Sequence, residues 1–129
     1  MKYPFRIFLA ILSVFVLTLS ACSNRDASKI QEAEKMIVAN PDSAMTMLRE
    51  VVNPHLLPDS AQALYWLSIA NIHSNLHQSL SEDSMVCWSA DFYLNAWQDV
   101  PQNERTSLLT KRMMKAQMLK VFYYWRINE

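Results

Sequence analysis

Few residues of this 129-residue chain have the types and spacing that a chemical site needs, and the first pair to consider is His73 and His77. Histidines four residues apart on a helix share one face and can bind a metal ion together. A complete site needs further ligands, which only His55, Cys87 or nearby carboxylates can supply here. We interpret the pair as polar residues beside a loop and predict no metal site; a metal or small-molecule carrier is the third of three functional hypotheses.

The acidic and nucleophilic residues do not form a catalytic arrangement either. Glu82 and Asp83 are adjacent, so on a helix they point in different directions. We interpret them as favourable charges in a first helical turn rather than as an acid–base pair. Cys87 lies in an apolar helical pattern, which is typical of a small buried side chain. No serine, histidine and acid occur in a recognisable nucleophilic order. We therefore predict a non-enzymatic protein without a cofactor.

The other cysteine, Cys22, has a more specific context. Two basic residues near the N-terminus precede an apolar stretch over 7–19, and small residues follow it. This order is typical of a secretory signal. The stretch is shorter than the ~20 apolar residues that cross a bilayer. Residues 19–22, with the sequence Leu-Ser-Ala-Cys, resemble the lipobox of bacterial lipoproteins. An uncleaved anchor and an ordinary secretory signal are the alternatives.

The lipobox resemblance implies how the N-terminal region is processed. It implies a signal peptide over 1–21, cleavage before Cys22, lipid on that cysteine, and a short tether over 22–27. Ser23 after the cysteine favours the outer membrane by the sorting rule of enteric bacteria. Only one acidic residue, Asp26, lies in the tether, so a surface-export signal is less well matched than a periplasm-facing position. We expect the chain to be attached to the cell envelope through this lipid.

The composition narrows the fold that can position these residues. Glycine is absent. Its absence excludes the glycine-rich loops that bind dinucleotides and phosphates, and it excludes the strained nucleophile elbow. It also disfavours the tight Asn-Gly and Asp-Gly hairpin turns of all-β folds. The sequence therefore predicts an all-α fold.

Apolar residues recur at helical spacing in five segments of this chain. Short loops between helices indicate antiparallel helical hairpins, here a domain over 28–129. The first expected helix begins at Ser28, with Gln31 as capping-box partner, and the second covers about 41–52. The third runs from a capping Asp59 to about Asn75. The fourth opens with a capping box at Ser79 and Glu82, and the fifth covers about 104–127.

Two of these segments resemble the helices of a tetratricopeptide repeat. Residues 40–48, with Ala44 at the small position, resemble the second helix of a repeat, and Trp66 with Ala70 resembles the first helix of the next. The chain is similar, over about 28–127, to tetratricopeptide-repeat lipoproteins of some anaerobic Gram-negative bacteria. That resemblance implies a short array of stacked hairpins that binds a protein or peptide.

The last predicted helix carries two features that bear on partners. It ends in an aromatic run, 123–125, which gives an apolar face with no further helix to cover it. This predicts a bound partner, packing back onto the stack, or a domain that is incomplete at its C-terminus. Met113, Met114 and Met118 cannot all lie on one helix face, so one or more can be exposed; we interpret the methionines as gap-filling core residues rather than as a Met-rich binding surface.

Charge is unevenly distributed between the middle and the end of the chain. Seven acidic residues and no Lys or Arg occur from Glu50 to Glu104, and six basic residues and no acid from Arg105 to Arg126. We expect the two regions to pair within the molecule, where each exposed pair contributes about 0–1 kcal/mol. A surface for acidic peptides or anionic lipid head groups is the alternative.

These observations support two leading functional hypotheses. The first is a lipid-anchored cell-envelope scaffold for protein–protein interaction, without catalytic activity, whose groove residues include Tyr65, His73 and Tyr123. The second is a truncated remnant of a longer tetratricopeptide-repeat sensor or regulator, without independent function. The expected partners are the membrane, through lipid on Cys22, and an unknown protein or peptide. Nucleic acid is not expected, because the processed domain lies outside the cytoplasm.

Overall fold

The computed structural model describes the backbone of residues 3–128 and the side chains of 3–15 and 25–128. Over these residues the chain is all-helical, with five α-helices, two short 3₁₀-helices and no strand, which confirms the predicted fold class. The α-helices are α1 (Tyr3–Met36), α2 (Pro41–Arg49), α3 (Asp59–Asn75), α4 (Met85–Asp99) and α5 (Ser107–Ile127), and the 3₁₀-helices are η1 (Pro54–Leu56) and η2 (Gln102–Glu104).

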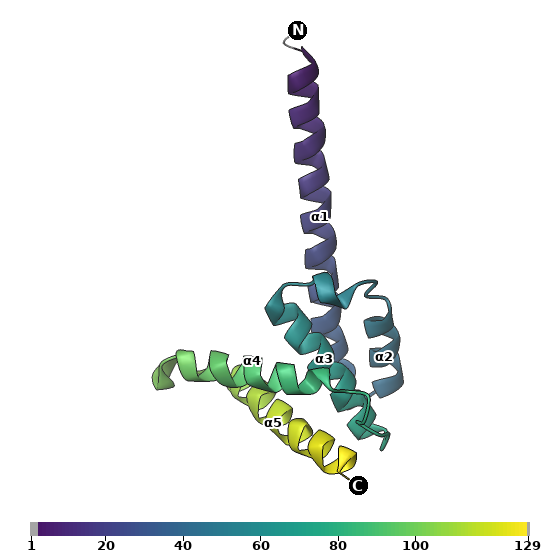
Figure 1. Ribbon diagram of the computed structural model, residues 1–129, viewed down its shortest axis with the longest axis vertical. Coiled ribbons are helices and arrows are strands. Elements are labelled where there is room, and N and C mark those ends of the chain that lie inside the picture. Colours follow the sequence, from purple (N-terminus) through teal and green to yellow (C-terminus); the bar gives the residue numbers. More distant parts are fainter. Residues whose placement is uncertain (1–2, 129) are drawn as a thin grey trace.

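Helix α1 is a single helix whose first half stands out from the rest of the molecule (Figure 1). The predicted helix start at Ser28 is wrong, since the helix begins 25 residues earlier, at Tyr3. No proline or glycine lies between these positions after Pro4 to break it. The described side chains before residue 16 are all exposed. Cys22 has its backbone in this helix, but its side chain lies outside the described ones.

Within the described residues, no helix combines the length and the apolar character needed to cross a membrane.

Two α-helices begin with side-chain caps. The Asn40 side-chain oxygen accepts a hydrogen bond from the Ser43 amide at 3.2 Å, and Pro41 follows it in the first helical position of α2. The Thr106 hydroxyl oxygen accepts from the Leu109 amide at 3.1 Å at the start of α5. In both helices the cap satisfies an amide that has no partner within the helix.

Two other predicted caps are wrong. Asp59 is the first residue of α3, and Pro58 holds the capping position without a side-chain hydrogen bond. The predicted capping box at Ser79 does not open a helix, because the Ser79 hydroxyl oxygen accepts from the Ser81 amide at 3.2 Å in a local turn. Helix α4 begins only at Met85. Short polar side chains serve caps and local turns equally well, so the spacing alone did not decide between them.

The helices pack around two hydrophobic clusters, and α3 contributes to both. Helices α1 and α2 contact each other and α3, while α4 and α5 contact each other and the other side of α3 (Figure 1). The first core cluster comprises Ile30, Ala33, Ile37, Ala44, Leu48, Val51, Leu57, Leu64, Tyr65 and Ile72. The second core cluster comprises Ala63, Leu67, Ala70, Leu80, Val86, Ala90, Tyr93, Ala116 and Leu119.

Ion pairs connect α5 to two other helices. The Arg112 guanidinium donates to both carboxylate oxygens of Glu34 on α1, at 2.8 and 2.7 Å. Lys120 donates to Asp91 on α4 at 3.1 Å. The predicted pairing between the acidic segment 50–104 and the basic segment 105–126 is therefore present at Lys120 and Asp91. Arg112 instead pairs with Glu34 on α1, which lies outside the acidic segment.

Candidate functional site

Helix α5 carries apolar side chains on two faces. The inner face packs on the second core cluster through Leu109, Met113, Ala116, Leu119 and Tyr123. The other face is a row of exposed residues that we call the outer stripe. Its members, each 39–64% exposed, are Met114, Met118, Val121, Phe122 and Trp125.

The spacing of the outer stripe makes it one continuous surface. Residues at i, i+4, i+7, i+8 and i+11 follow one side of a helix. Single exposed apolar side chains are normal on soluble proteins, but a contiguous row marks an interaction surface. Met113 packs against the core while Met114 and Met118 are exposed, so the three do not share one face, as predicted, and the interpretation as core residues is right only for Met113.

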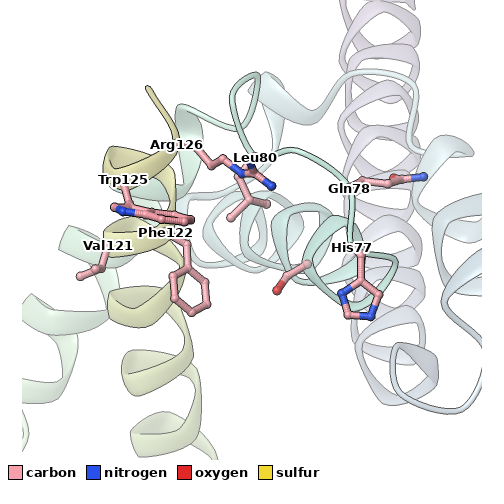
Figure 2. A pocket seen from close by; sticks show the side chains of 8 residues that line it. His77, Gln78, Leu80, Val121, Phe122, Trp125 and Arg126 are labelled. Atoms are coloured by element: carbon pink, nitrogen blue, oxygen red, sulfur yellow. The ribbon is translucent and has the colours of Figure 1, made fainter. Parts of the chain in front are cut away.

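A groove lies beside the C-terminal half of the stripe. Figure 2 shows Phe122 and Trp125 on one side of it, His77 and Gln78 on the other, and Leu80 between them. The groove encloses about 510 Å³. That volume lies within the range of about 300–1,000 Å³ that is typical of ligand pockets. The groove can therefore receive a large side chain of a partner.

The far wall of the groove is a structured connection between α3 and α4. The Gln78 amide donates to the His73 carbonyl at 2.8 Å, and the His77 amide donates to the Ser74 carbonyl at 3.1 Å. This pair of bonds is the Schellman motif, which needs a left-handed residue after the helix. His77 takes that conformation, with φ of 56°, in a chain that has no glycine. The wall is held by the backbone and not only by side-chain packing.

The two histidines do not form the pair that their spacing suggested. His73 is in the last turn of α3, whereas His77 lies beyond the helix end, so they do not share a helical face. Among the described side chains, no three of His, Cys, Asp and Glu lie where they could hold one metal ion. His73 instead contacts Asp83, with 2.7 Å between Nδ1 and Oδ2.

Asp83 belongs to the same connection and has an altered pKa. Burial raises the pKa of its carboxyl group, and the hydrogen bond from His73 partly opposes that rise. The interpretation of Asp83 as a charge in the first turn of a helix is wrong, because α4 begins at Met85. The contact between Asp83 and His73 joins two positions ten residues apart across the connection. No local spacing rule indicates such a contact.

The three groove residues expected from the sequence are placed differently in the structure. Tyr65 is buried in the first core cluster, its ring edge-on to Trp66 at 4.8 Å. Tyr123 packs against the second core cluster. His73 is bound to Asp83 and is not among the residues that line the groove. The groove is instead lined by residues neighbouring these in sequence, because the helix rotation decides which side chains point outwards.

Two further predictions concern the aromatic end of α5 and the burial of Cys87. The aromatic end of the chain is exposed as predicted, with Tyr124 at 47% and Trp125 at 62%. Cys87 is half-buried and packs against the second core cluster. The sequence thus predicted the exposed end of α5. It did not predict the part of the outer stripe from Met114 to Val121, because the packing of α4 on α5 decides which face of α5 is exposed.

Comparison with protein-family models gives no match, and comparisons with curated proteins and with solved structures give none either. The fold and the site therefore define this molecule as an all-α protein of packed helical hairpins with an uncovered apolar helix face.

Proposed function

We propose that this chain is a lipid-anchored, non-catalytic protein of the cell envelope that binds a partner protein through the outer stripe of α5. The observation that carries the proposal is the row of exposed apolar side chains beside a groove of about 510 Å³. The partner presents an apolar helical surface, because a straight stripe on a helix is matched by another helix or helix pair.

The residue types of the stripe fit a protein interface. Aromatic side chains and methionine are enriched in the buried centre of interfaces, and tryptophan is frequent among the residues that dominate binding energy. Trp125 and Phe122 line the groove, and Met114 and Met118 extend the apolar surface along the helix. Methionine adapts to different partner shapes because its side chain is unbranched and flexible.

The anchor in this proposal is lipid on Cys22, at the residue where the sequence resembles a lipobox. Cys22 precedes Ile30, the first core residue of α1, by eight positions. Eight helical residues span about 12 Å. A lipid at this position would hold the helical domain close to the membrane, most simply the outer membrane on its periplasmic side. The tetratricopeptide-repeat resemblance supports the same kind of role, a scaffold for a protein or peptide.

Crosslinking in intact cells of the native host tests the partner. We expect the unmodified chain to crosslink to a partner protein, and a variant with Val121→Ala and Trp125→Ala to lose at least nine-tenths of that product. The matched control is Val52→Ala with Leu56→Ala, which truncates two exposed apolar residues away from the stripe. Equal crosslinking by both variants, or no product from the unmodified chain, would overturn the docking proposal.

The anchor has its own test, membrane fractionation. A Cys22→Ser variant should leave the membrane fraction if lipid on this cysteine attaches the chain. Cys87→Ser is the control, since it removes the other cysteine and should stay with the membrane. Retention of a Cys22→Ser variant that has lost residues 1–21 would contradict the lipid anchor without bearing on the docking surface, whereas a retained variant that still carries the apolar segment over 7–19 is held by that segment.

The uncovered stripe also favours a second candidate, a remnant of a longer repeat-containing sensor or regulator. In a stacked array the outer face of one hairpin is covered by the next hairpin. Translation of the DNA that follows the coding sequence distinguishes the two. Continued repeat-like helices in any frame support the remnant, and their absence in all frames supports the docking protein.

A further inference from the structure

A second cavity lies between α1, α3 and α5 and shares no lining residue with the groove beside the outer stripe. It encloses about 290 Å³. Its apolar lining comes from Ile37, which directly follows α1, from Leu67 on α3 and from Leu108 on α5. This volume is at the small end of ligand pockets, which favours a small molecule over a long chain.

The cavity has an excess of positive charge. Lys35, Lys111 and Lys115 line it, and no hydrogen bond or ion pair engages any of them within the described part of the chain. The one acid in the lining is Glu34, and both of its carboxylate oxygens already accept hydrogen bonds from Arg112. Lys35 and Lys111 are exposed and Lys115 is half-buried, so the positive charge of the three lysines is accessible to an anion from outside the chain.

A buried hydroxyl in the same lining also lacks a partner. Ser68 of α3 is 1% exposed, and its Oγ has no hydrogen bond within the described residues. The comparison with Ser89 of α4 is instructive, because that equally buried hydroxyl donates to the Ala63 carbonyl at 2.9 Å. Buried polar groups are nearly always paired, so an unpaired one in a cavity wall calls for a polar partner from outside the chain, a water molecule or a ligand.

We propose that this cavity binds a small monocarboxylic acid with a short apolar chain. In this arrangement the apolar chain of the ligand lies against Leu67 and its apolar neighbours. The carboxylate forms ion pairs with Lys111 and Lys115, and the Ser68 hydroxyl donates a hydrogen bond to a ligand oxygen. The ligand needs both a negative charge and an apolar chain, because the lining has lysines as well as apolar side chains. An inorganic anion would leave the apolar walls unused, and an apolar cation would be repelled by the lysines. The inference does not depend on the proposed docking function.

Nuclear magnetic resonance titration of the full chain in a non-ionic detergent tests the site. Hexanoate should shift the backbone amide signals of residues that line this cavity, with saturation below about 10 mM. Hexylamine has the same apolar chain with the opposite charge, and inorganic phosphate has charge without the chain. Neither should saturate the same signals. Saturation by either at the same concentration, or none by hexanoate, would overturn the proposal.

Variants locate the binding more finely. Lys111→Gln with Lys115→Gln should weaken hexanoate binding about tenfold, since each charge-assisted contact is lost. Lys120→Gln is the matched control on the same helix, because that lysine is paired with Asp91 and lies outside the cavity lining; it should bind as before. Ser68→Ala should weaken binding several-fold without lowering the melting temperature. Unchanged binding in the double variant would contradict the assignment.

Discussion

Helices α3 and α5 are both apolar on more than one side, but only α3 is covered on both. On α3, Leu64, Tyr65 and Ile72 belong to the first core cluster, and Ala63, Leu67 and Ala70 belong to the second. Helices α1 and α2 lie against one side of it and α4 and α5 against the other. Helix α5 packs against α3 and α4 and reaches α1 through the Arg112–Glu34 pair, and its outer stripe is left exposed.

The difference shows how position in a stack turns the same kind of helix into core or surface. A helix that is apolar all round is expected to be buried between neighbours. Helix α3 lies between two pairs of helices and is buried on both sides, whereas no described element covers the outer stripe of α5. The burial of apolar surface that stabilises α3 as a core element would also favour covering this stripe.

The largest expected effects separate buried from exposed positions on these two helices. Leu64→Ala on α3 and Leu119→Ala on the inner face of α5 should each lower the free energy of unfolding by about 2–5 kcal/mol, because each removes buried methyl groups and leaves a cavity. Val121→Ala on the outer stripe should change it by no more than about 0.5 kcal/mol. Urea unfolding of the full chain in a non-ionic detergent, followed by circular dichroism, measures all three.

The control for this set is Leu56→Ala, an exposed leucine outside both helices, which should behave like the outer-stripe variant. If Val121→Ala destabilises the protein as strongly as Leu119→Ala, the stripe is covered within the molecule. In that case the contrast between α3 and α5, and the docking proposal with it, would be wrong.

The sequence could predict this contrast only in part. Helical periodicity located α2, α3 and α5, with Asn75 as the end of α3, because an apolar pattern reports burial directly. The exposed aromatic end was predicted for the same reason. Helix starts were predicted less well, as Ser28 and Ser79 show, because serine caps helices and also forms local turns or lies within a helix.

The features that the sequence did not indicate all depend on contacts between distant residues. The Glu34–Arg112 pair joins positions 78 residues apart, and it forms only because α5 packs near the end of α1. Whether a hydroxyl such as that of Ser68 finds a partner depends on which carbonyls surround it after packing. Local spacing rules describe neighbours on one element, so they could not give either result.

An intermediate effect is expected from the connection between α1 and α5. Glu34→Gln should lower the free energy of unfolding by about 1–2 kcal/mol, because the negative charge and one of the two acceptors for Arg112 are lost where both side chains are about four-fifths buried. The hydrogen bond and charge of Glu34 raise the pKa of Arg112, so the guanidinium stays charged. Urea unfolding again provides the measurement.

The matched control is the Lys120–Asp91 pair, which joins α5 to α4 at the surface. Asp91→Asn should cost no more than about 0.5–1 kcal/mol, because Asp91 is mostly exposed and its charge is screened by water and salt. A double-mutant cycle for each pair separates coupling from other effects. Equal coupling energies would show that the link from α1 to α5 is no stronger than a surface contact.

The smallest expected effect lies in the connection that forms one wall of the groove, and it depends on pH. Burial raises the pKa of Asp83 above its ordinary value of 3.8, so the folded protein holds this proton where the unfolded chain has lost it. The folded state then binds more protons, and the contribution of this group to stability falls as pH rises. Asp83→Asn should remove that contribution.

The measured quantity is the free energy of unfolding of the original chain minus that of the Asp83→Asn variant. This difference should decrease as the pH rises from about 3.5 to 5, an interval below the range in which histidine ordinarily titrates. Because the variant differs from the original chain only at residue 83, the slope of the difference reports Asp83 and its contact with His73. A difference that increases over this interval would mean that the hydrogen bond from His73 outweighs burial. The connection would then stabilise the groove wall through an ionised carboxylate, and α3 and α4 would be joined by charge rather than by packing alone.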